Sequence, residues 1–245
     1  MSTHETVLPI TPGQLKELSA ALVLAVPLDM SSETAQAWIG QKGRLQDILR
    51  RGPGLVCQTH STSISFLLKD WQLFYRKFFG LDVDFSNVRI PDRRPGFDRL
   101  IVAAQGLTLN RVYEVMQSSF ACKKYADDLD SAIQNDHNPA TKHYAIWVHD
   151  GQEGEEEIKN RSGNDFQRRN VKGMTLLEGM VFGLKYWSET GKHLDVNNIT
   201  LCLGSRGRCG GVPFVSWSRS SDKVSVDCYS PGSDGPLRSR EVVSF

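Results

Sequence analysis

The chain lacks a complete catalytic, metal-binding or nucleotide-binding motif in its 245 residues. It also lacks an excess of charge of either sign, because 29 basic and 28 acidic residues leave a formal net charge of +1. A protein devoted to nucleic acid more often carries a clear basic excess, so this balance argues against a chain-wide electrostatic role. Hydrophobic residues at 40% and charged residues at 23% are ordinary for a globular protein and argue against a disordered or fibrous chain.

Long hydrophobic runs are missing too, since no stretch approaches the roughly 20 apolar residues that span a bilayer. The apolar segment 18–26 follows acidic residues and has no basic leader, so it resembles an amphipathic helix opening at Thr11-Pro12 more than a signal peptide. Five cysteines, an odd number, show no disulfide-framework spacing and predict a reducing, cytoplasmic compartment. The pair Cys57-x-x-His60 has no matching second pair of ligands, so we predict no metal site. We likewise predict no cofactor, and the missing apolar runs predict no membrane association.

Hydrophobic periodicity predicts helices over the first 80 residues. Apolar residues at helical spacing mark a helix within 31–51, and a second one over 64–79 is dense in aromatic side chains and stops at Gly80. Burial is the simplest explanation of those aromatics, and a protein–protein interface is the alternative.

From residue 81 onward the pattern mixes strands with helices. A helix is expected over 108–118, and a second begins with a capping box of Thr175 and Glu178 and ends at Gly191. The acidic run 153–157 fits the first turns of a helix, while 121–142 has no clear assignment. Strands are expected at 81–86, 99–104, 144–148, 199–203, 212–217 and 223–229. The sequence thus predicts an α+β fold, with N-terminal helices (1–80) packed on a mixed sheet with crossover helices in 81–245, in one continuous core.

A candidate site follows if the strands 99–104, 144–148 and 199–203 are parallel neighbours joined by two right-handed crossovers. Their carboxyl ends would then meet at one edge, where open α/β sheets bind ligands. The polar residues at those ends are Gln105, Thr108, His149, Asp150, Ser205, Arg206 and Arg208. Thr108 would also present a helix N-terminus suited to an anion.

Three functions are compatible with these residues. Arg206 and Arg208, in a glycine-rich loop, suit the phosphates or carboxylates of an anionic partner, nucleic acid included, which would make the chain a binding or accessory protein. Alternatively, His149 beside Asp150 would act as a base in an enzyme, with Arg206 holding a small anionic substrate. The third function is protein interaction or self-association through helix 64–79.

Several segments resemble a family of uncharacterised bacterial proteins. They include Phe97-Asp98-Arg99-Leu100-Ile101-Val102, Tyr144-Ala145-Ile146-Trp147-Val148, Gly173-Met174-Thr175-Leu176-Leu177-Glu178, Glu189-Thr190-Gly191-Lys192-His193-Leu194-Asp195 and Arg240-Glu241-Val242-Val243-Ser244. The resemblance covers roughly Leu81 to the end. It implies a recurring bacterial α+β unit and, because no activity is established for that family, it assigns no catalytic residue.

Overall fold

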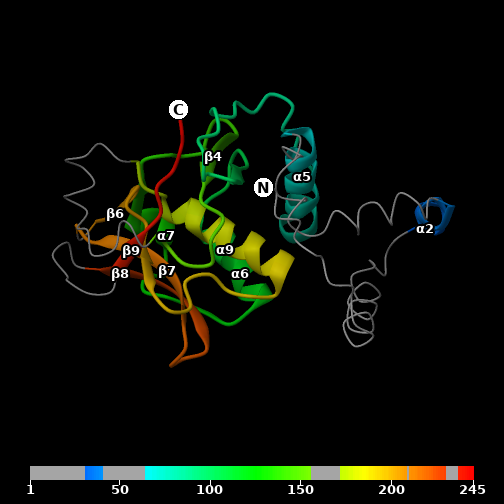
Figure 1. The fold of residues 1–245 in the computed structure, drawn as a ribbon. Helices are drawn as coiled ribbons and strands as arrows, with labels where there is room; N and C mark the ends of the chain where they lie inside the picture. Colours follow the sequence, from blue (N-terminus) through cyan, green and yellow to red (C-terminus); the bar gives the residue numbers. More distant parts are fainter. Residues whose placement is uncertain (1–30, 41–63, 156–171, 209, 230–236) are drawn as a thin grey trace, which may run out of the picture. The chain divides into compact units, whose positions relative to one another are not determined.

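The computed structural model describes residues 31–40, 64–155, 172–208, 210–229 and 237–245 (Figure 1). The chain divides into two compact units, Met1–Ser61 and Thr62–Phe245. In the first unit the structure describes α2 (Ser32–Gly40), and the helix expected from Thr11 lies outside the described residues. The unit boundary precedes residue 64, whereas the sequence pattern suggested a boundary after residue 80.

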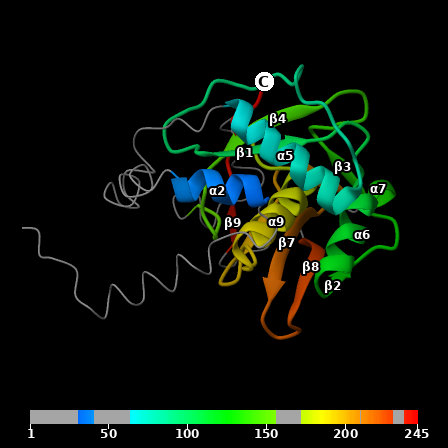
Figure 2. The ribbon, with the colours of Figure 1, turned by 90° about the vertical axis from the view of Figure 1, so that its right-hand side faces the viewer.

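Helix α5 (Ile64–Phe79) belongs to the second unit because it is bound to strand β1 (Arg99–Ala103). The indole N–H of Trp71 donates to the carbonyl of Leu100 (3.1 Å), and the Tyr75 hydroxyl donates to the carbonyl of Val102 (2.7 Å). Figure 2 shows α5 running across β1. Burial of this aromatic face is thereby confirmed, while use of the helix as an interface stays a prediction.

Strand β1 pairs with β4 (Tyr144–Val148) in an antiparallel ladder, with Arg99 opposite Val148 and Ala103 opposite Tyr144. The predicted parallel arrangement of these two strands is therefore wrong. The third strand of that prediction, β5 (Ile199–Leu201), lies in a different sheet.

The larger sheet has five strands in the order β2-β8-β7-β5-β9. Their bounds are β2 (Cys122–Lys124), β8 (Lys223–Tyr229), β7 (Val212–Ser218), β5 and β9 (Leu237–Ser239). The sheet is mixed, because β2 runs parallel to β8 and β5 parallel to β9 while the remaining neighbours are antiparallel. The predicted α+β class with a mixed sheet is confirmed.

Helix α9 (Leu176–Thr190) lies between the two sheets, in contact with β1 on one side and β7 on the other, and packs against α6 (Leu109–Ser119) (Figures 1 and 2). Apolar side chains on several faces suit this buried position. The predicted capping box of Thr175 and Glu178 is present, and Gly191 ends the helix in the left-handed conformation (φ 68°). No helix of the described segments has the length and apolar character needed to cross a membrane.

Two predicted elements differ from the structure. Residues 81–86 form no strand: Asp84 accepts hydrogen bonds from the backbone N–H and hydroxyl of Ser86 and so bends the chain, leaving Phe85 as the fully buried side chain of the segment. The described part of the acidic run is not helical either, because Glu153 accepts backbone N–H groups of residues 196–198 instead. Residues 156 and 157 of that run lie outside the described residues.

Three short elements remain among the residues that the structure describes. Helix α7 (Leu129–Ala132) leads directly into β3 (Ile133–Asn135), in a region to which the sequence pattern assigned no structure. Strand β3 pairs antiparallel with β6 (Ser205–Gly207), which lies inside the glycine-rich loop. This pairing brings the arginine loop beside the start of α6 and so positions the candidate site.

Candidate functional site

A cleft of ≈ 760 Å³ opens where the start of α6, the α7–β3 segment and the end of β6 meet. Its apolar lining comes from Leu107, Leu109, Ile133 and Leu177, all of them buried. Its polar lining consists of Thr108, Asp130, Ser131, Gln134, Asn135, Asn138 and Arg208. Apolar side chains combined with a few placed polar groups are the usual lining of a small-molecule site.

The α6 wall of the cleft has its helix N-terminus already occupied. Thr108 is the N-cap, and its hydroxyl accepts the backbone N–H of Arg111 (3.2 Å). The carboxylate of Asp130 accepts the backbone N–H groups of Leu109 (2.7 Å) and Asn110 (3.3 Å). The expectation that Thr108 presents an open anion site is therefore wrong, because a side-chain carboxylate of the protein already fills it.

The α7 wall is attached to α6 through Asp128 and Asn110. Asp128 caps α7 by accepting the backbone N–H of Ser131 (3.1 Å), and it also accepts the side-chain N–H of Asn110 (2.7 Å). The Asn110 carbonyl in turn accepts the backbone N–H of Leu129 (3.0 Å). Hydrogen bonds from Ser131 and Asn110 lower the pKa of Asp128 to about 2, so this attachment persists at any ordinary pH.

The β6 wall is held by Ser205, which is fully buried. Its hydroxyl donates to the side-chain carbonyl of Asn135 (2.5 Å) and accepts the backbone N–H of Leu176 at the start of α9 (2.8 Å). Ser205 was expected to bind an anion, but both hydrogen-bonding capacities of its hydroxyl serve to join β3, β6 and α9. It is a structural residue of the cleft.

The two arginines of the β6 loop have different environments. Arg206 Nη1 donates to the carbonyls of Leu203 (2.9 Å) and Ser205 (2.8 Å), so this guanidinium shapes its own loop. Arg208 is exposed, its backbone N–H donates to Ala132 (3.0 Å), and its side chain lines the cleft. Within the described residues the Arg208 guanidinium has no ion pair or hydrogen bond, which leaves its donors available.

His149 and Asp150, the predicted base and its neighbour, lie apart from this cleft. Antiparallel pairing puts the start of the His149-Asp150 segment beside Arg99, at the opposite end of β1 from Gln105 and Thr108, and four residue steps at ~3.4 Å separate the two ends by roughly 14 Å. The His149 ring packs on Phe97 (centroids 4.1 Å apart), and Asp150 lies 4.0 Å from Arg99. The predicted catalytic group, in which His149 and Asp150 act together with Arg206, is therefore not assembled.

Gln105 does not line the cleft, but the next residue, Gly106, does. The Gln105 N–H donates to Nδ1 of His143 (2.8 Å). Burial lowers the pKa of His143, which favours the neutral ring that this acceptor role requires.

A second cavity lies in the core between α9 and the large sheet. Its volume of ≈ 20 Å³ is room for about one water molecule, and its lining includes Asp195, Thr200, Cys202 and Arg240. It is too small for a ligand, and the carboxylate of Asp195 there accepts hydrogen bonds from Thr200 (2.7 Å) and Arg240 (2.9 Å).

Comparison with protein-family models, with curated proteins and with solved structures found no match. The resemblance to uncharacterised bacterial proteins stays a prediction. The function is therefore argued from the geometry of the cleft.

Of the seven predicted site residues, the structure brings Thr108 and Arg208 together at the cleft. The sequence pattern missed the amides of the cleft wall, among them Gln134 in β3 and Asn138 after it. A signal for part of this wall exists, because Asp128-x-x-Ser131 has the spacing of a helix cap. The β3–β6 pairing that turns this segment toward Arg208 has no comparable local signal.

Proposed function

We propose that the protein binds a small polar molecule carrying a phosphate or carboxylate group in the cleft beside Arg208. The observation that supports this is a guanidinium on the wall of the cleft that has no ion pair or hydrogen bond to the described residues, beside polar groups that are mostly uncharged. A guanidinium presents a rigid fork of N–H donors that matches both oxyanions, and such charge-assisted hydrogen bonds are among the strongest in proteins.

The charge balance of the cleft supports an anionic ligand. The other charged side chain of the lining is Asp130, and its carboxylate is held by two backbone N–H groups of α6. These bonds, together with the positive end of the helix dipole, offset its charge, whereas no carboxylate of the described residues forms an ion pair with Arg208. The ligand's anionic group is thus expected at Arg208.

The size and polarity of the cleft indicate the rest of the ligand. A volume of ≈ 760 Å³ lies within the range of roughly 300–1,000 Å³ for small-molecule sites. Gln134 and Asn138 offer both donors and acceptors, which suits hydroxyl or amide groups. One arginine in a chain of net charge +1 fits a small anion better than nucleic acid, which usually requires several phosphate contacts.

Isothermal titration calorimetry with inorganic phosphate, a hexose phosphate and malate tests this function. We expect at least one of these probes to bind, and Arg208→Ala to weaken that binding by at least tenfold, because a hydrogen bond to a charged group contributes about 1.5–3 kcal/mol. Arg76→Ala is the matched control. It removes the same charge from an arginine on α5 that forms an exposed ion pair with Asp82, and it should leave the affinity unchanged.

Two results would overturn the proposal: the absence of binding by all three probes, and equal affinities of Arg208→Ala and the natural chain. A parallel titration with a short oligonucleotide distinguishes the alternative partner. Binding that falls steeply with salt concentration would indicate nucleic acid instead of a small anion.

A further inference from the structure

His137 lies between a carboxylate and a hydroxyl in the arrangement of a proton relay. Its Nδ1 is 3.1 Å from Oε1 of Glu178, and its Nε2 is 3.3 Å from Oγ of Ser244. The three residues come from three distant segments: the turn after β3, the first turn of α9 and the end of the chain. Neither the charge pattern nor the spacing of the sequence indicates this cluster.

The Glu178 carboxylate is held in place by burial and by a hydrogen bond of its own. Glu178 is fully buried, and its second oxygen accepts the backbone N–H of Thr175 (2.7 Å) within the capping box. A carboxylate in this position accepts Nδ1–H of His137, which leaves the Nε2 lone pair facing the Ser244 hydroxyl. Glu178 is thus a positioning residue that selects the tautomer able to accept a proton from Ser244.

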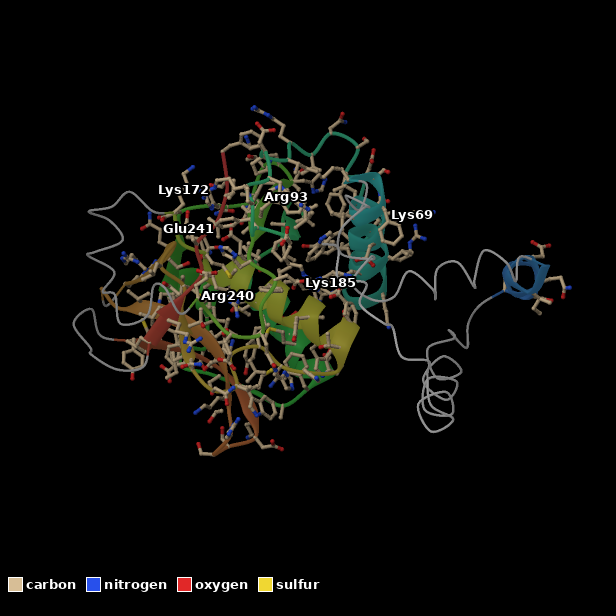
Figure 3. The ribbon with its side chains drawn as sticks, in the orientation of Figure 1. Lys69, Arg93, Lys172, Lys185, Arg240 and Glu241 are labelled. Atoms are coloured by element: carbon tan, nitrogen blue, oxygen red, sulfur yellow. The ribbon has the colours of Figure 1, made fainter. Side chains whose placement is uncertain are left out.

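The hydroxyl is held in place by the segment that carries it. Val243 exchanges two backbone hydrogen bonds with Trp147 of β4 (2.9 and 3.0 Å), and the Val242 N–H donates to Lys172 (2.9 Å). The neighbouring bridge between Gly173 and Glu241 is reflected in Figure 3, where Lys172 and Glu241 lie side by side. Among the described residues, the Ser244 hydroxyl has one other acceptor, the main-chain oxygen of Phe245 at 3.4 Å, which is a weaker contact.

We propose that Ser244 is a nucleophile for acyl transfer, with His137 as its general base and Glu178 orienting the imidazole. Oγ of Ser244 forms a bond to the carbonyl carbon of an ester as its proton moves to Nε2 of His137. The ester C–O bond then breaks, and the same proton passes to the leaving alcohol. A water molecule then forms a bond to the acyl carbon as its proton moves to Nε2 of His137. The bond between that carbon and Oγ breaks, the acid leaves, and the proton passes to Oγ and restores the Ser244 hydroxyl.

The charges near Ser244 indicate the kind of ester. The Lys172 ammonium donates to the carbonyl of Phe245, next to the nucleophile (2.5 Å), and can stabilise negative charge that develops on the substrate oxygen. The Arg89 guanidinium lies 4.5 Å from the centre of the exposed Phe245 ring. Two cations beside an aromatic ring favour an aryl ester that carries a negative charge.

A fluorophosphonate probe tests the nucleophile directly in the full chain. The serine oxygen forms a bond to phosphorus and fluoride leaves, so mass spectrometry of the C-terminal peptide reports modification of Ser244. We expect stoichiometric labelling of the natural chain, none at this peptide in Ser244→Ala, and at least a 100-fold slower reaction in His137→Ala. Ser118→Ala is the control, because that exposed serine on α6 bonds to its own helix carbonyl.

The pH profile separates a catalytic role of His137 from a structural one. The hydrogen bond with Glu178 raises the pKa of His137, against the lowering effects of burial and of Lys172, and Asp136 adds to the increase. The labelling rate should fall as the pH drops through this raised pKa, since only the neutral imidazole accepts the proton.

Hydrolysis of a p-nitrophenyl ester carrying a carboxylate should follow the same profile and be lost in Ser244→Ala. No labelling of Ser244 between pH 6 and pH 9 would overturn the proposal. So would unchanged labelling in a His137→Ala variant whose circular dichroism and melting temperature match those of the natural chain. Arg208→Ala should leave labelling intact, so failure of the cleft proposal and failure of this one are distinguishable.

Discussion

Arg240→Met should be among the most damaging single substitutions in the described part of the chain. Arg240 is 1% exposed, and Figure 3 shows it in the interior beside α9. Its guanidinium donates to the carbonyls of Gly151 (2.9 Å) and Gln152 (3.1 Å) and to the carboxylate of Asp195 (2.9 Å). Methionine keeps much of the apolar stem but supplies none of these donors.

The expected loss is about 3–5 kcal/mol of unfolding free energy, because the substitution leaves the Asp195 carboxylate buried without its counter-charge. Asp195 retains the hydroxyl of Thr200 as a hydrogen-bond donor (2.7 Å). Adding Asp195→Asn removes the uncompensated charge and keeps a side chain that tolerates the positive φ of 53° at this position. We therefore expect the double variant to be more stable than Arg240→Met alone, with a coupling energy of about 2 kcal/mol.

The loss of unfolding free energy in Arg240→Met should also depend on pH. Burial raises the pKa of Asp195, although Arg240 and Thr200 act to lower it, and removal of Arg240 raises it further. A folded state that holds this proton more tightly than the unfolded chain is favoured at low pH and loses that advantage as the pH rises through the folded-state pKa. The penalty of Arg240→Met is therefore expected to grow between pH 4.5 and pH 7.5.

Urea denaturation followed by tryptophan fluorescence at these two pH values measures the effect. The reasoning would be refuted by a deficit below about 1 kcal/mol at pH 7.5, since breaking a buried ion pair costs more than that. A deficit independent of pH would also contradict it. A double variant as unstable as Arg240→Met would show that the buried charge is not the cause.

Two further predictions concern α9. Gly183→Ala should raise the unfolding free energy by about 0.5–1 kcal/mol, because an added Cβ meets no atom within 4 Å and alanine favours the helix interior. Gly179→Ala, one turn earlier, should gain less or lose stability in the same urea titration, since its Cβ would lie 3.1 Å from Val215. Thr175→Ala should cost about 1 kcal/mol by removing the N-cap acceptor, and Thr175→Ser should retain most of the stability; a loss equal in both variants would contradict a capping role.

The elements that sequence reasoning found are those whose signals are local. Helix α9 begins at its capping box and ends at Gly191. The strands expected at 212–217 and 223–229 form the β7–β8 hairpin, which turns through Asp222 in the left-handed region (φ 52°). In these cases the residues that set the boundary lie within a few positions of it. The alternation at 81–86 shows the limit of such signals, because the Asp84–Ser86 turn overrides it.

Strand direction was not predictable in this way. The helix between β1 and β4 suggested a parallel crossover, but α6 is followed by β2, α7 and β3 before the chain enters β4. This longer path returns the chain to the end of β1 from which it left, so the pair is antiparallel. The rule for right-handed crossovers applies only after two strands are known to be parallel, which the residue pattern alone does not establish.

The cleft and the relay share one short segment, although their key side chains do not touch. Asn135 and Asn138 line the cleft, and His137 between them faces Glu178 and Ser244. On α9, successive side chains point about 100° apart, so Leu177 lines the cleft while Glu178 holds the imidazole. A ligand contacting both asparagines would therefore touch the chain on either side of the general base. This arrangement gives one physical route by which anion binding at Arg208 would change the reactivity of Ser244.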